Sequence, residues 1–267
     1  MKKLVCTFAL SAAAVSLSHG TLVSGLTTYW DLDNNMSDSA HGLAGSASAF
    51  DDSLTAQGGH SGAFGAGLFG GAGYIGSGPN TGRFEAALTD DLWGSTDNIS
   101  VSWWGRATNF TTGWQAGVTN GEGNRWRFHR AGNDQTIAWQ GGGGDIRDNA
   151  VNVNDGSWHH FLGTKDSAGG RVLYIDGDVI ATGPAGTALE QGTTPVMIGE
   201  NADSNGRGWL GDIDDVAIWN RALSQSEVDD IFNAGTAGGA LGSLVPEPST
   251  GLLGALAFGL LFIRRKR

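Results

Sequence analysis

Residues 156–161, Gly-Ser-Trp-His-His-Phe, and residues 172–177, Val-Leu-Tyr-Ile-Asp-Gly, decide the fold. Their apolar side chains are spaced as in β-strands, which predicts strands over Trp158–Lys165 and up to Ile175. Asp176-Gly177 separates the second run from Val179-Ile180-Ala181. Asp-Gly between hydrophobic runs is a strong hairpin signal, because a type I′ turn needs positive φ at both central residues. The middle of the chain is therefore expected to be antiparallel β-structure.

Strands are also expected on either side of this region. Ile99–Arg106 alternates, so that Ile99, Val101 and Trp103 face one way and Trp104 and Arg106 the other. The remaining expected strands are Thr27–Leu32, Trp114–Thr119, Asn124–Arg130, Gln135–Gln140, Pro195–Gly199 and Trp209–Trp219. The glycine-rich stretch Gln57–Gly73 predicts a loop with at most one short strand.

A single helix is expected near the end of the strand-rich region. Ser224 and Glu227 form a capping-box pattern, Val228, Ile231 and Phe232 supply an apolar stripe, and Gly235 ends it. The 45 glycines and 10 tryptophans of the 267 residues suit many short strands joined by tight turns.

Three segments resemble the laminin G-like branch of the concanavalin A-like lectin and glucanase proteins. The first is Ile99–Trp104, the second is the Gly156–Phe161 strand with its Tyr174–Gly177 hairpin, and the third is Gly211–Ser224. The three segments occur in the order and at the spacing of that family, and together they span nearly all of the chain between its two ends. The resemblance implies an all-β fold, a two-sheet antiparallel jelly-roll sandwich with one short C-terminal helix.

The N-terminal residues have the pattern of a secretory signal peptide. Lys2 and Lys3 precede the apolar run Leu4–Leu17, and Ser18-His19-Gly20 offers small residues for cleavage before Thr21. We therefore expect a signal peptide over 1–20, removed by signal peptidase. The single cysteine, Cys6, lies inside this segment, so the exported chain has no disulfide and no thiol chemistry.

The C-terminal residues have the pattern of a second targeting signal. Pro246-Glu247-Pro248 precedes the apolar segment 251–263 and the cations Arg264, Arg265, Lys266 and Arg267. This arrangement resembles the bacterial PEP-CTERM sorting signal, which implies transient membrane contact and processing by an exosortase. We expect a domain over 21–235, a flexible linker over 236–244 and the sorting signal over 245–267. The protein is then exported to the cell envelope, cell surface or extracellular matrix.

Charge excludes one class of partner. The formal net charge is −11, and the two end segments carry six of the 16 cations, so the remainder is still more acidic. Nucleic-acid binding needs clustered cations and is not expected.

No catalytic residues are expected. Retaining glycoside hydrolases place carboxylates at alternating positions on one strand. No glutamate here has an acidic partner two residues away on a strand, and Asp212-x-Asp214 matches the closing strand of the family. His159 and His160 face opposite ways on one strand and do not share a metal.

Calcium is the expected cofactor, in a structural role. Asp31 and Asp33 share a face at the end of the first strand, and carboxylates suit Ca²⁺. The resemblance implies that the first and last strands are neighbours, which would bring Asp214 to the same site. The alternative is that these acids are solvated turn residues.

A polysaccharide is the expected ligand. Trp104 and Arg106 lie on the polar face of their strand, where an exposed indole would stack on a sugar ring. Trp126 joins them as a candidate, and Trp114 and Trp139 are further ones. For these three tryptophans the favoured alternative is a place in the core of the sandwich. The interpretation is a non-catalytic, exported glycan-binding domain. The alternatives are a structural matrix or biofilm component without a ligand, and a glycan-active hydrolase.

Overall fold

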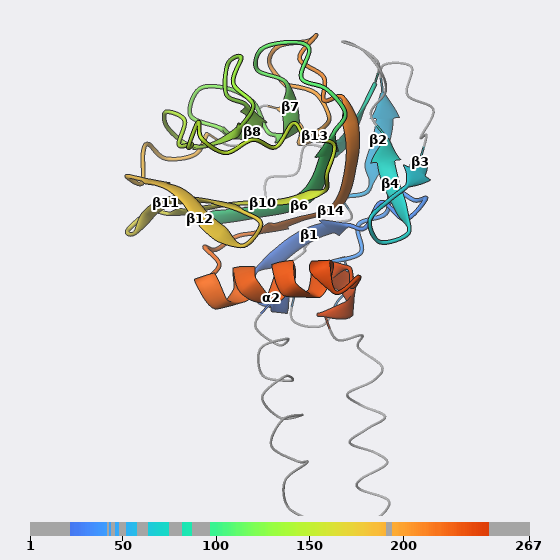
Figure 1. Cartoon of the computed structure of the whole chain (residues 1–267). Coiled ribbons are helices and arrows are strands. Elements are labelled where there is room, and N and C mark those ends of the chain that lie inside the picture. The colour runs from blue at the N-terminus through green and yellow to red at the C-terminus, as the bar shows by residue number, and fades with distance from the viewer. Residues whose placement is uncertain are drawn as a thin grey trace, which may run out of the picture.

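The computed structural model describes residues 22–41, 43, 46–47, 52–57, 64–74, 82–86, 97–190 and 194–245. Two antiparallel sheets face each other across a hydrophobic core, and a helix lies on the outside of one of them (Figure 1). The expected all-β jelly-roll sandwich with one short C-terminal helix is confirmed. The predicted signal peptide 1–20 and the sorting motif Pro246-Glu247-Pro248 lie outside the described residues.

The larger sheet has eight strands within the described part of the chain. They are β1 (Leu26–Trp30), β3 (Phe64–Ala66), β4 (Gly71–Tyr74), β6 (Ile99–Ala107), β10 (His159–Asp166), β11 (Gly170–Ile175), β12 (Asp178–Gly183) and β14 (Gly211–Trp219). Their order is β12-β11-β10-β6-β14-β4-β3, with β1 also paired to β14. The first and last strands are therefore neighbours, as expected.

The smaller sheet forms the opposite layer. Its strands are β2 (Leu54–Gln57), β5 (Arg83–Ala86), β7 (Ala116–Thr119), β8 (Trp126–Arg130), β9 (Ile137–Gly141) and β13 (Met197–Ile198). Their order is β2-β5-β13-β7-β8-β9. Ile146 extends this sheet by pairing with Trp139, on the side of β9 away from β8.

Two local predictions are confirmed in detail. Asp176 and Gly177 have φ values of 55° and 83°, as the type I′ turn between β11 and β12 requires. The helix α2 (Gln225–Thr236) begins after Ser224, which forms the reciprocal capping box with Glu227. Both motifs act through neighbouring residues, and sequence alone is sufficient to identify them.

The prediction for Gln57–Gly73 is wrong, because this stretch contributes both β3 and β4 to the larger sheet. Its glycines serve close packing. A side chain at Gly71 would meet the backbone of Leu32 and Asn34, and one at Gly73 would meet the ring of Phe84. Glycine is present here because neighbouring chain segments approach closely, and such approaches are absent from local sequence signals.

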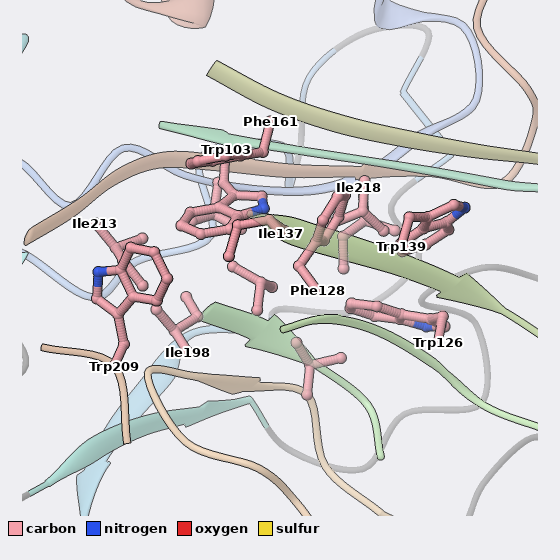
Figure 2. Packing of buried hydrophobic residues seen from close by; sticks show 14 of the residues in the cluster. Trp103, Trp126, Phe128, Ile137, Trp139, Phe161, Ile198, Trp209, Ile213 and Ile218 are labelled. Carbon is pink, nitrogen blue, oxygen red and sulfur yellow. The ribbon is translucent and has the colours of Figure 1, made fainter. Parts of the chain in front are cut away.

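The core between the sheets is built around the indole of Trp103. Its ring stacks on Phe161 with 4.5 Å between centroids, and Trp209 and Phe128 meet it edge-on at 5.3 and 5.8 Å. Figure 2 shows these rings with Trp126, Trp139 and the surrounding isoleucines filling the interior. Aromatic residues thus supply much of the apolar area that holds the two layers together.

A second apolar layer covers the outer face of the larger sheet. Helix α2 lies on this face, away from the smaller sheet (Figure 1). Val228 and Ile231 pack there with Leu22 and Val23 from the start of the described chain and Leu244 from its end. Both faces of the central strands are consequently buried.

The expected flexible linker 236–244 is instead packed against the domain. It contains the short 3₁₀ helix η1 (Leu241–Ser243), and Leu241 is buried. The buried carboxylate of Asp215 accepts a hydrogen bond from Leu241 N at 2.7 Å and another from the hydroxyl of Tyr29. Composition suggested a linker, but apolar side chains and one buried acid hold it in place. Within the described residues no helix has the length and apolarity of a membrane span.

Candidate functional site

Trp104 is not the exposed platform that the alternation suggested. Its side chain is 4% exposed and lies beneath α2, with Phe232 at 5.9 Å, His160 at 5.0 Å and Phe69 at 5.7 Å between ring centroids. The polar residues beside it are satisfied within the protein. Ser102 Oγ lies 2.8 Å from His160 Nε2, and Ser100 Oγ donates to Arg221 O. Helix α2 packs on the strand face that looks polar in the sequence.

The other two predicted ligand residues do not complete a binding site with Trp104. Trp126 is fully buried in the inter-sheet core, so it does not face a ligand. Arg106 is partly exposed, but its guanidinium is bound to Asp212 Oδ2 at 2.5 and 2.9 Å and lies over the Trp158 ring at 5.1 Å. The three residues therefore do not form a common groove.

The exposed aromatic residue is Trp114, on the smaller sheet. Among the described residues, Trp114 and Val179 are the large hydrophobic side chains that are exposed, and Trp114 is 38% exposed. It lies two residues before β7, and its ring lies 5.3 Å from the ring of His129 on β8. Its φ is 64°, a left-handed conformation that costs a bulky residue roughly 1–2 kcal/mol.

A charged cluster continues from Trp114 across the outer face of this sheet. Trp126 and Phe128 point into the core, so the alternate residues Arg127 and His129 lie on the other side of the sheet, where His129 is nevertheless buried. His129 reaches over Ala138, its small cross-strand partner, and its Nε2 lies 3.0 Å from Asp145 Oδ1. Asp145 and Arg147 flank Ile146, whose side chain packs in the core.

Asp145 is surrounded by cations. Burial alone would raise its pKa, but the hydrogen bond with His129 and the charges of His129, Arg127 and Arg147 hold the pKa below its ordinary value. Arg147 Nη1 lies 3.6 Å from Asp145 Oδ2. We define the Trp114 surface as Trp114, Arg127, His129, Asp145 and Arg147.

Sequence reasoning named Trp114 but missed the charged members of this surface. The available signal was the alternation of Arg127 and His129 with core residues on β8. Asp145 and Arg147 carried no comparable signal, because their position depends on the pairing of Ile146 with Trp139.

The predicted calcium ligands are partly brought together. Asp33 Oδ1 accepts from Gly71 N at 2.6 Å, and Asp214 Oδ2 accepts from Leu68 N at 2.8 Å, so both carboxylates hold the loop between β3 and β4. Burial, with the charge of Asp33 adding to it, raises the pKa of Asp214 to about 7.

Asp31 has other partners. It binds Asp33 N, the Asn35 amide and the Ser39 hydroxyl within its own loop. No group of three or more His, Cys, Asp or Glu side chains in the described ranges is arranged to hold a metal ion. A cation at Asp33 and Asp214 would therefore need backbone oxygens as further ligands.

A sequence profile of the concanavalin A-like lectin/glucanases superfamily matches residues 80–229. This is more than half of the chain, and the protein belongs to that superfamily. Two curated relatives match a shorter part, both named sushi, von Willebrand factor type A, EGF and pentraxin domain-containing protein 1. The Rattus norvegicus protein is 31% identical over 96 residues, which are 32% of this chain and 3% of the relative. The Mus musculus protein is 32% identical over 90 residues, which are 30% of this chain and 2% of the relative.

Solved structures share the fold at low sequence identity. Domain 4 of the extracellular arabinanase AbnA from Geobacillus stearothermophilus, in complex with arabinotriose, has a TM-score of 0.61 and 21% identity, covering 78% of this chain and 98% of that one. The binding domain of Paraclostridial Mosquitocidal Protein 1 has a TM-score of 0.62 and 16% identity, covering 79% of this chain and 52% of that one. The binding domain of botulinum neurotoxin DC in complex with SialylT has a TM-score of 0.57 and 15% identity, covering 79% and 52%.

The histidine pair of β10 yields a prediction about pH. His160 is fully buried, and burial lowers its pKa to about 4, so it is neutral near pH 7. His159 Nδ1 lies 2.7 Å from Asp176 Oδ2 and its Nε2 lies 3.2 Å from Asp155 Oδ1. The hydrogen bond to Asp176 raises the pKa of His159, against the opposing effect of burial.

A raised pKa in the folded state means that His159 stabilises the fold below its unfolded pKa of about 6.5, and that this contribution is lost as the pH rises through the folded pKa. His159→Gln should therefore lower the free energy of unfolding at pH 5.5 by on the order of 0.5–1 kcal/mol, with a smaller deficit at pH 9. Urea denaturation at the two pH values measures the difference. In an Asp176→Asn background, the His159→Gln deficits at the two pH values should differ less. Equal deficits of His159→Gln at both pH values in the otherwise unchanged protein would contradict the assignment.

Proposed function

We propose that this domain binds an extracellular polysaccharide through the Trp114 surface. The observation that carries the proposal is Trp114 itself, an indole that is 38% exposed and held at a φ of 64°. The indole is only partly buried, and strained residues of this kind cluster at functional sites. The outer face of the larger sheet is covered by α2 and both ends of the described chain, whereas Trp114 remains open to a ligand.

The chemistry of this surface suits sugar rings. An indole face stacks on the C–H groups of a sugar, while neighbouring polar side chains bond its hydroxyls. The comparisons support this coarse assignment: one similar domain was solved with arabinotriose and one similar binding domain with SialylT. No paired carboxylates for hydrolysis were found on this face among the described residues, where Asp145 is engaged by His129.

We also propose that Ca²⁺ binds in a structural role at Asp214 and Asp33. Asp214 is buried, and its Oδ1 has no hydrogen-bond partner in the described structure. An orphaned carboxylate oxygen near the second carboxylate, Asp33, fits a bound cation, with the β3–β4 loop supplying backbone oxygens. Bound Ca²⁺ would neutralise the two acids and fix this loop beside β14.

Export and sorting complete the proposal. Signal peptidase would remove 1–20, and an exosortase would recognise Pro246-Glu247-Pro248 and process the C-terminus. Leu22, Val23, Leu244 and Val245 lie in one cluster beside α2. The described chain therefore begins and ends on the outer side of the larger sheet, opposite the Trp114 surface, which suits display of that surface away from an attachment point.

Trp114→Asn tests the binding site, because asparagine tolerates positive φ. The variant should bind glycan about five-fold more weakly or worse, since stacking is worth about 1 kcal/mol, while its stability stays within about 1 kcal/mol of wild type. A glycan array identifies the ligand, and isothermal titration calorimetry measures the two dissociation constants.

Trp104→Ala is the matched control, because the loss of a buried indole should cost roughly 3–5 kcal/mol of stability. Unchanged glycan affinity in Trp114→Asn would refute the site. If the wild-type protein bound no glycan at millimolar concentration, a structural matrix component would be the better interpretation.

Calcium should raise the thermal unfolding midpoint, because a ligand that binds only the folded state stabilises it by mass action. The melting temperature in 1 mM CaCl₂ should exceed that in EGTA by several degrees, roughly 2–4 °C for each kcal/mol of binding stabilisation. Asp214→Asn should abolish the shift, while Asp31→Asn should keep it. Identical melting curves with Ca²⁺ and EGTA would exclude the site.

Processing predicts a defined mass for the exported protein. Intact-mass spectrometry of the envelope and extracellular fractions should find a chain that lacks residues 1–20 and the cluster Arg264–Arg267. Retention of Arg264–Arg267 in the exported form would refute the exosortase assignment without affecting the glycan proposal.

A further inference from the structure

Three arginines on or beside the Trp114 surface, Arg127, Arg147 and Arg207, share two carboxylates, Glu122 and Asp145. Arg127 Nη1 lies 2.9 Å from Glu122 Oε1, and Arg207 Nη1 binds that same oxygen. Asn201 Nδ2 donates to it as well, at 2.9 Å. One carboxylate oxygen thus serves two guanidinium groups and an amide.

The hydrogen bonds of the Arg127 guanidinium are incomplete. Its Nε is buried and has no hydrogen-bond partner in the described structure. Gln140 lies opposite Arg127 on β9, and its buried Oε1 is also without a partner. Buried polar groups normally have a hydrogen-bond partner, so the arrangement of Arg127 and Gln140 is not fully satisfied within the described structure.

The second carboxylate of this region, Asp145, faces Arg127, His129 and Arg147. Arg147 and Arg207 are more accessible than Arg127, with side chains 34% and 30% exposed against 11%. Counted together, Arg127, Arg147 and Arg207 face only Glu122 and Asp145 as ion-pair partners.

Other described arginines are balanced differently. Arg83, Arg106 and Arg221 each have a carboxylate of their own, in Glu85, Asp212 and Glu227. Arg125 contacts two, Asp203 and Glu190. Arg130 and Arg171 are bound to backbone carbonyls, such as Asp134 O and Pro184 O. In a chain of net charge −11, cations in excess of their partners mark the place where an anion would bind.

We propose that the polysaccharide bound at the Trp114 surface carries carboxylates, as a polyuronate does. This inference rests on the glycan-binding function proposed above and names the ligand class. A sugar ring stacks on Trp114, and the carboxylates of that ring and its neighbours pair with Arg147 and Arg207. Guanidinium groups bind carboxylates through two parallel hydrogen bonds, which gives selectivity over neutral sugars. The acidic remainder of the protein disfavours adsorption of polyanions elsewhere.

Polygalacturonate and its fully methyl-esterified form are the matched probes, because esterification removes the charge and keeps the sugar backbone. Titration calorimetry with the purified protein in EDTA and 50 mM NaCl should show about ten-fold tighter binding of polygalacturonate, the scale of a charge-assisted contact. The preference should shrink in 0.5 M NaCl, where exposed charges are screened.

Arg147→Gln should weaken binding of polygalacturonate about five-fold or more and leave the affinity for the ester unchanged. Arg83→Gln removes an equal charge from β5 of the same sheet, outside the Trp114 surface, and should change neither affinity. Circular dichroism melts check that both variants fold.

The outcomes separate this inference from the proposed function. Equal, Trp114-dependent binding of the two probes, or Trp114-dependent binding of neutral glycans alone, would overturn the polyuronate inference and leave glycan binding intact. Dextran sulfate binding as tightly as polygalacturonate and independently of Trp114 would also overturn it, as nonspecific attraction of polyanions. Absence of binding to every glycan would refute both.

Discussion

The burial of two consecutive tryptophans on opposite faces of β6 is the constraint on which the rest of the structure depends. Trp103 fills the space between the sheets, and Trp104 fills the space between the larger sheet and α2. A strand whose both faces carry a buried indole must lie in the middle of three layers. The smaller sheet and the helix are the layers that cover it, and each must leave room for a large ring.

Glycine provides that room. A side chain at Gly105 or Gly117 would overlap the Trp103 ring, and one at Gly235 of α2 would overlap Trp104. Gly163 makes the same allowance for Trp139. The high glycine content therefore reflects close packing around aromatic rings as well as turns. Interiors pack too densely to accept even one added methyl at such positions without displacement.

The three-layer arrangement also decides where a ligand can bind. Serines and a histidine on the outer face of the larger sheet look polar in the sequence, yet they bond to one another and to the chain that follows β14. The outer face of the smaller sheet keeps an exposed indole beside ion-paired charged side chains. This is why the glycan site is proposed there, where a stacking surface lies beside groups that can bond hydroxyls.

The sequence by itself determined the strands of the central region, the Asp176-Gly177 turn and the capped helix, because these depend on residues within a few positions of one another. It also determined the alternation that separates Trp103 from Trp104. Only the tertiary structure decided which of the two faces would meet solvent, because α2 lies more than a hundred positions away in the chain. The same long-range packing fixed the segment 236–244 through Asp215, joined Asp33 to Asp214 across the β3–β4 loop, and left Trp114 exposed. Local patterns specify which side chains share a face, whereas the covering of that face depends on contacts between distant segments.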